Sequence, residues 1–170
     1  MKADFSLSDF QLGLIGTVFM MVHATGSVPL GILADKWIRK NIIAIGVSIW
    51  SVATFFTGLS YSFIQLLITR GIVGIGEASY APSATSLIAD NFPKEKRAKA
   101  SSIFHLGMFF GGTLGMVLSG LISIHFGWRA CFFIVAIPGL ILVYFVLKIN
   151  EVKHEHHITD EVNFTNIVGL

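Results

Sequence analysis

Five long apolar stretches, separated by short polar breaks, dominate the pattern of hydrophobic and polar positions along the chain. Each is close to the roughly 20 apolar residues that a helix needs to cross about 30 Å of hydrocarbon, where backbone polar groups must bond internally. Breaks this short place successive helices side by side, running up and down. The pattern therefore predicts an all-α, polytopic transmembrane bundle of about five spans, at residues 11–33, 41–59, 63–89, 100–124 and 128–149.

Basic residues give this bundle an orientation, because short cytoplasmic loops are enriched in lysine and arginine. They are concentrated in the first and third breaks, which we therefore expect in the cytoplasm: Lys36, Arg39 and Lys40, then Lys94, Lys96, Arg97 and Lys99. The first span then runs inward and Met1 lies outside, which predicts that a helix is missing upstream. We expect residues 1–149 to form a partial amino-terminal bundle, and residues 150–170 to form a cytoplasmic linker truncated before the next span.

Composition agrees with lipid as the main partner. Hydrophobic residues make up 54% of the 170 positions and charged residues only 13%, about half the charged share of a typical soluble domain. A net charge of +2 without a long basic face argues against nucleic acid. Phosphate-binding loops, nucleophile elbows and zinc-protease motifs are absent, so we expect neither an enzyme nor ATP-driven transport, and no cofactor. We also expect no metal site, because adjacent histidines in a flexible tail, as at 154–157, seldom close around an ion.

The first break carries a charged motif. Asp35 and Arg39 lie four residues apart near a helix end, where they can pair locally or reach neighbouring helices. The simpler alternative is that these charges only set topology at the headgroups. The motif resembles the signature that the major facilitator superfamily carries between its second and third helices: Gly31, Asp35, Lys36, Arg39 and Lys40. Ile38 departs from it, because the family usually has glycine there.

The third stretch contains two charges in an apolar setting. Arg70 and Glu77 are seven residues apart, so they share a helix face about 10 Å apart along the axis. Exposing either charge to hydrocarbon costs at least about 2.5 kcal/mol, so both should face protein or a water-filled cavity. Alternatively, Arg70 extends to the outer headgroups and Glu77 is a neutral, hydrogen-bonded core group.

Longer runs extend the resemblance to the Spinster-type branch of the superfamily, especially its bacterial members, at residues 70–82, 87–93, 96–97, 127–130 and 138–139. The resemblance implies helices two to six of a twelve-helix secondary transporter, which moves a small organic or lipid-like solute with proton coupling. It also implies that Arg70 and Glu77 serve substrate binding or proton coupling, with partners on the first helix. Other branches, including organic-anion symporters, carry the same Gly-Glu-Ala as residues 76–78.

Two further groups of residues are candidates for conformational roles. We expect Asp35 and Arg39 to lie near Asp90 and Arg97, forming a cytoplasmic gating cluster with the other charges of the first break. A stripe of small residues at Gly107, Gly111 and Gly115 predicts close helix packing.

Two functions remain open from the sequence. One is secondary transport, most naturally at a bacterial inner membrane, which would require the missing helix and a carboxy-terminal half. The other is a truncated membrane fragment with a packing role only, because alternating access needs two halves around a central site.

Overall fold

The computed structural model describes residues 2 and 4–149, apart from the side chain of Asp35. Every regular element in this part of the chain is a helix, which confirms the all-α prediction. The predicted linker at 150–170 lies outside the described residues. Four of the helices are long and apolar enough to cross a membrane: α1 (Asp9–Lys36), α2 (Arg39–Gly58), α5 (Lys94–Phe126) and α6 (Trp128–Leu147).

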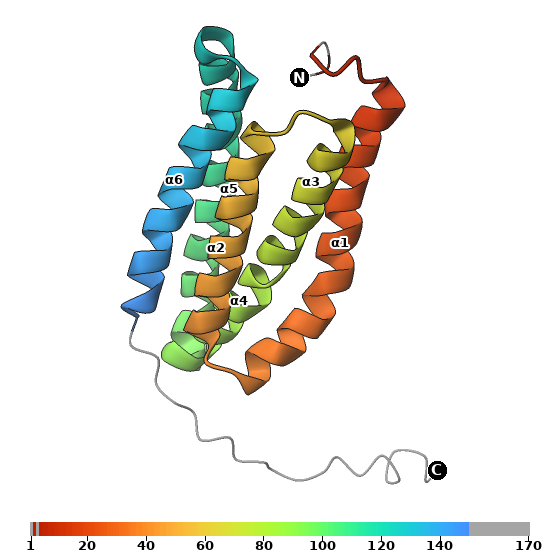
Figure 1. Cartoon of the computed structure of the whole chain (residues 1–170). Coiled ribbons are helices and arrows are strands. Elements are labelled where there is room, and N and C mark those ends of the chain that lie inside the picture. Colours follow the sequence, from red (N-terminus) through yellow and green to blue (C-terminus); the bar gives the residue numbers. More distant parts are fainter. Residues whose placement is uncertain (1, 3, 150–170) are drawn as a thin grey trace, which may run out of the picture.

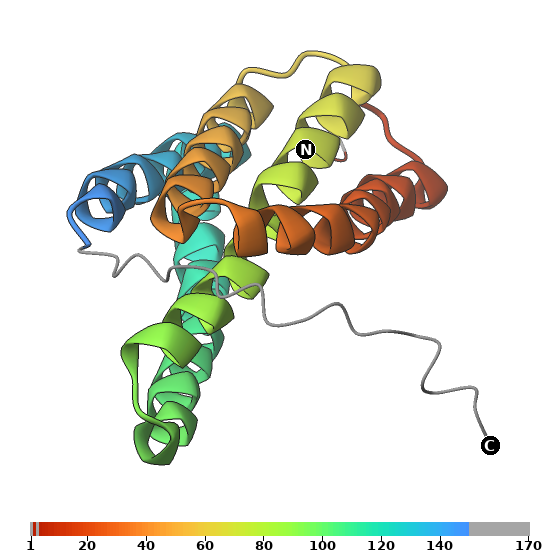
Figure 2. The same ribbon diagram turned by 90° about the horizontal axis from the view of Figure 1, so that it is seen from below.

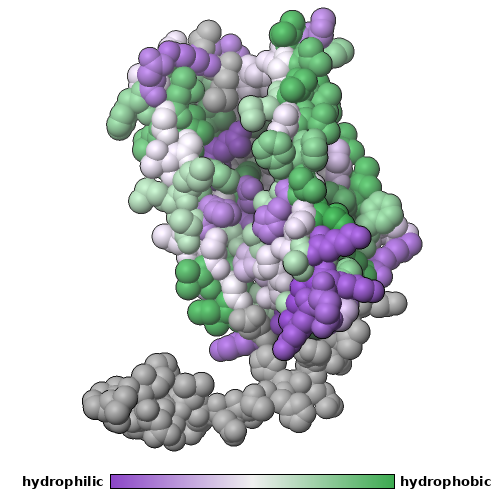
Figure 3. Space-filling model, turned by 180° about the vertical axis from the view of Figure 1, so that it is seen from behind, coloured by the Kyte–Doolittle hydropathy of each residue, from purple (hydrophilic) through white to green (hydrophobic). Residues whose placement is uncertain are grey.

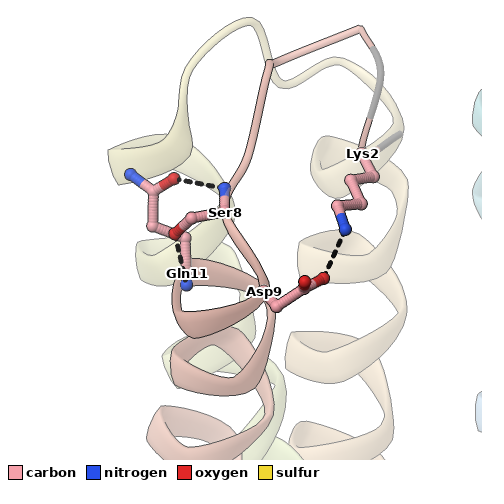
Figure 4. A network of polar contacts seen from close by, with 4 residues as sticks. All are labelled: Lys2, Ser8, Asp9 and Gln11. Atoms are coloured by element: carbon pink, nitrogen blue, oxygen red, sulfur yellow. Dashed lines mark hydrogen bonds and ion pairs between the residues drawn. The ribbon is translucent and has the colours of Figure 1, made fainter.

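The start of α1 is set by local hydrogen bonds (Figure 4). The Ser8 hydroxyl accepts from the backbone N–H of Gln11, and the Gln11 side chain accepts from the backbone N–H of Ser8. This reciprocal pair satisfies two N–H groups that the helix itself leaves without partners. Asp9 in the first turn favours the positive end of the helix dipole and forms an ion pair with Lys2.

The third predicted span, at residues 63–89, is formed by two consecutive helices. α3 (Phe63–Ala78) and α4 (Tyr80–Asn91) are separated by Ser79, and each is too short to span alone. Pro82 explains the break, because its ring has no N–H to donate to the carbonyl of Ala78. Serine hydroxyls donate to other carbonyls around the break: Ser79 to that of Gly76 at 2.8 Å and Ser83 to that of Ser79 at 2.7 Å.

The third break is also shorter than expected. Only Phe92 and Pro93 lie between α4 and α5, so the predicted loop over 90–99 is largely helix. Lysine, arginine, glutamate and alanine after Pro93 are strong helix formers, and the proline provides the extended residue before the first turn. With 33 residues, α5 is about 50 Å long and carries the basic cluster beyond the hydrocarbon.

The helices form an open bundle around α2 (Figure 1). α2 packs against α3, α4 and α6, and nine of its 20 residues are buried. α1 packs on α3 and α4, whereas α5 contacts, among the described helices, only α4 and α6. Seen from below, α1 and α5 splay apart and do not touch (Figure 2). The described part of the chain therefore has a packed side at α2 and α3 and an open side between α1 and α5.

Candidate functional site

A groove of about 540 Å³ runs between α3, α5 and α6, and Arg70 is the charged residue that lines it. The backbones of α3 and α6 do not pack directly on each other. Arg70 bridges them instead, because its guanidinium carbon lies 5.1 Å from the ring centre of Phe132 on α6. A cation over an aromatic face is attracted by the ring's negative face, more strongly where water is excluded. Arg70 therefore points into the groove, away from the packed contact with α1.

Glu77 lies two turns along α3 from Arg70 and is half-buried. It does not line the groove around Arg70. Within the described residues, however, it is the charge whose field acts on the Arg70 guanidinium. The structure thus places one member of the predicted pair in the groove and keeps the other within electrostatic reach.

The open side of the bundle is hydrophilic at its centre. Viewed from the side of α4 and α5, hydrophilic side chains gather in a hollow between two apolar ridges (Figure 3). Polar residues from α2 and α5 contribute to the groove wall, namely Thr54, Ser119 and Ser123. Such a polar depression in an otherwise apolar bundle is typical of a solute path.

The predicted cytoplasmic gating residues are partly brought together. Arg39 at the start of α2 forms an ion pair with Asp90 at the end of α4, and both side chains are about four-fifths buried, at 17% and 21% exposed. The Asp35 side chain lies outside the described residues. Arg97 donates from Nε to the carbonyl of Phe92 at 3.0 Å, and among the described residues it does not join the Arg39 pair. The ion pair fastens α2 to α4, while a role in gating stays a prediction.

The remaining residues of that motif lie at the same end of the bundle. Lys36 is exposed in the last turn of α1, and Lys40 donates to the carbonyl of Ile149 at 3.1 Å. A Cβ atom added at Gly31 would lie 3.7 Å from Pro82, an ordinary packing distance, so α1 contacts α4 at this glycine.

The glycine stripe of α5 meets open space. A Cβ atom added at Gly107, Gly111 or Gly115 would have no neighbour within 4 Å among the described residues. None of the described residues of α5 is buried. The close helix contact that these glycines predict is therefore not made within the described chain, and the packing role stays a prediction.

Several groove residues were not anticipated. Phe132 partners Arg70, and the buried Cys131 beside it donates from Sγ to the carbonyl of Ser119 at 3.2 Å, which ties α6 to α5. The available signal was the presence of Thr54, Ser119 and Ser123 inside apolar stretches. Which of them share a groove depends on helix packing, which spacing alone does not specify.

Comparison with known proteins decides the family. The sequence profile of the Major Facilitator Superfamily matches residues 1–167. The chain belongs to this superfamily. Its members are transporters with several membrane-spanning helices, so the protein is an integral, multi-pass membrane protein of a transporter family.

Relatives confirm the resemblance to Spinster proteins. The chain is 31% identical over 142 residues to the "Probable sphingolipid transporter spinster homolog 1" of Arabidopsis thaliana, covering 84% of this chain and 29% of the relative. It is 31% identical over 143 residues to the "Sialic acid transporter NanX" of Escherichia coli K12, covering 84% of this chain and 35% of the relative.

The fold has a close counterpart among solved structures. A crystal structure of a bacterial homolog of the human lysosomal transporter Spinster, inward-facing and occupied, superposes with a TM-score of 0.76 at 34% identity. The match covers 89% of this chain and 38% of that one. The chain thus spans only about a third of the length of the proteins that it resembles.

Proposed function

We propose that the chain is part of a proton-coupled secondary transporter that moves a small organic or lipid-like solute across a bacterial inner membrane. The observation that carries this proposal is the position of Arg70, which lines a groove in the apolar bundle and bridges to Phe132 across it. A guanidinium held in a partly dry groove binds carboxylate or phosphate groups well. Relatives named as transporters of a sphingolipid and of sialic acid support this solute class.

Glu77 is our candidate for the proton-coupling residue. It is a carboxyl half-buried on α3, two turns from Arg70, so one helix face carries a group that can hold a proton and a group that can bind an anionic solute. Proton binding and solute binding would then be linked through one helix face.

The second candidate function is that of a membrane fragment that inserts and packs without transport. The open face of α5, which has no buried residue, supports it, because alternating access requires a partner surface and no described residue covers this face. Sequencing the gene on both sides would establish whether a first helix and a second half exist.

The test compares the chain alone with a full-length transporter containing it, each reconstituted in proteoliposomes. Solute uptake driven by a pH gradient should occur only in the full-length protein, and Glu77→Gln should abolish its dependence on the gradient. Glu95→Gln, at the exposed start of α5, is the matched control and should leave transport unchanged. Full pH-driven uptake by the Glu77→Gln variant would refute the coupling role.

A further inference from the structure

A second groove, of about 820 Å³, lies between α2 and α3. Its size falls within the range of about 300–1,000 Å³ that is usual for ligand pockets. Val52 lines this groove and Thr54 lines the groove around Arg70. Positions two residues apart on a helix point about 200° apart, so the two grooves lie on opposite sides of α2. The second groove is therefore separate from the proposed solute path.

Polarity changes along this groove. Its wall is mostly apolar, with Ile49, Val52, Phe56 and Ile72, whereas Ser60, Tyr61 and Gln65 form a polar rim at one end. Two further hydroxyls on the wall, of Ser48 and Thr69, donate to backbone carbonyls of their own helices. The rim lies at the end of the bundle opposite the basic breaks, which is the outer end by the distribution of lysine and arginine. From Ser60 to Ile49 the chain covers about 16 Å, close to half of a hydrocarbon layer about 30 Å thick. The groove thus matches one leaflet in depth and in polarity.

The cationic side chain of Arg129 lies at the polar rim. Arg129, at the start of α6, donates from Nη2 to the carbonyl of Ser60 at 3.2 Å, and its guanidinium carbon lies 5.7 Å from the ring centre of Tyr61. The side chain remains 37% exposed. Guanidinium has five N–H donors. The described residues take up these donors through one hydrogen bond to Ser60 and a long contact of 3.5 Å to Asp4, while aromatic rings lie against the guanidinium face, the nearest being Trp128 at 4.4 Å. Arg129 therefore retains donors for an anion at the mouth of the groove.

We propose that this outer groove, defined by Ile49, Val52, Phe56, Ile72 and the Ser60–Tyr61–Gln65 rim, binds one phospholipid of the outer leaflet. One acyl chain lies along the apolar wall, and the headgroup phosphate accepts hydrogen bonds from Arg129. Guanidinium and phosphate have matching geometry and opposite charge, which distinguishes a held phospholipid from hydrocarbon that merely fills the groove. Asp4 opposes the anion, because its carboxylate competes for the same guanidinium.

The test uses native mass spectrometry of the purified chain in detergent, with phosphatidylglycerol or with diacylglycerol of the same acyl chains. We expect one phosphatidylglycerol to be retained, and diacylglycerol to bind at least tenfold more weakly because it lacks the phosphate. Val52→Phe fills the groove and should weaken phosphatidylglycerol binding about tenfold. Its matched control is Val117→Phe, a change at a similarly exposed position on α5 that should leave binding unchanged.

The charge at the rim is tested in both directions. Arg129→Gln should weaken phosphatidylglycerol binding about fivefold and leave diacylglycerol binding unaltered, whereas Asp4→Asn should strengthen phosphatidylglycerol binding two- to threefold. Equal retention by the wild type and Val52→Phe would overturn the groove as the binding site. Equal binding of the two lipids, or no change in either rim variant, would overturn the phosphate contact with Arg129.

Discussion

Glycines occur in both α3 and α5, but their surroundings are opposite. At Gly76 on α3, an added Cβ would lie 2.7 Å from the carbonyl oxygen of Gly46 and 2.8 Å from the backbone nitrogen of Trp50, both on α2. At Gly111 on α5, nothing lies within 4 Å. Membrane helices gain stability from close backbone approach at small residues, because lipid removes the hydrophobic drive between helices. Gly76 on α3 thus lies in a close contact with α2, whereas the glycines of α5 lie on a surface that no described residue covers.

The same contrast divides the bundle into a packed side, which stabilises the chain, and an open side, which can contact partners. α2 is buried between α3, α4 and α6, whereas α5 adds length and apolar surface without burying any residue. Mutations on the packed side should therefore affect the stability of the chain itself. Mutations on the open side should change stability only when another surface covers that side.

The largest effect is expected at the α2–α3 contact. Gly76→Ala should lower the free energy of unfolding by about 2 kcal/mol, because the new methyl group overlaps backbone atoms of α2 that cannot rotate away. Thermal unfolding in detergent, followed by circular dichroism, measures this loss. Gly107→Ala on the open face is the control and should not lower stability. Unchanged unfolding of Gly76→Ala would show that α2 and α3 are not in close contact.

The next effect tests the ion pair that fastens α4 to the packed side. Asp90→Asn should reduce stability by about 1–2 kcal/mol, because it removes the charge of a carboxylate that pairs with the largely buried Arg39 guanidinium. A double-mutant cycle with Arg39→Gln isolates the contribution of the pair. Additive losses in the cycle would mean that the two side chains do not interact in the membrane.

Hydropathy was sufficient for the positions of the helices but not for the break in the third span. Pro29 lies inside α1 and Pro138 inside α6, and neither helix is interrupted. Pro82, by contrast, follows a break within a predicted span, where the hydroxyls of Ser79 and Ser83 donate to the carbonyls of Gly76 and Ser79. Because neighbouring helices and hydroxyls can satisfy freed carbonyls, a proline alone does not reveal whether a membrane helix ends.

The candidate site was predictable to the extent that it lies on one helix. Spacing placed Arg70 and Glu77 on one face of the third span, but the ring of Phe132 comes from another helix far along the chain. The contacts of Arg129 with Asp4 and Ser60 likewise join three distant segments. Such pairings depend on how helices cross, and the spacing of residues along the chain carries no signal for them.

A smaller effect concerns the contact between the amino-terminal segment and α6. The indole N–H of Trp128 donates to Asp4 at 2.7 Å, which, together with Arg129, lowers the pKa of this carboxyl below its usual 3.8. A lowered folded-state pKa means that the contact stabilises the protein above pH 3.8 and is lost as the pH falls through the folded-state value. Nitrogen-15 NMR of the Trp128 indole should therefore show an upfield proton shift on acidification below pH 3.8. In Asp4→Asn the same resonance should not titrate, and a titration that persists there would assign it to another group.

The smallest effect is expected at the open face of α5, and it distinguishes a face that packs on a partner helix from one that faces lipid. In this chain Gly111→Ala should leave stability unchanged or raise it by up to about 1 kcal/mol, because alanine favours helix and its methyl group meets no neighbour. In a full-length transporter containing the same residues, the methyl group should instead lower stability or transport if a partner helix lies against the stripe. Thermal unfolding of both proteins, with Gly76→Ala as the variant that is destabilising in each, makes the comparison direct. A neutral Gly111→Ala in both settings would show that the stripe faces lipid, and the packing role of Gly107, Gly111 and Gly115 would be wrong.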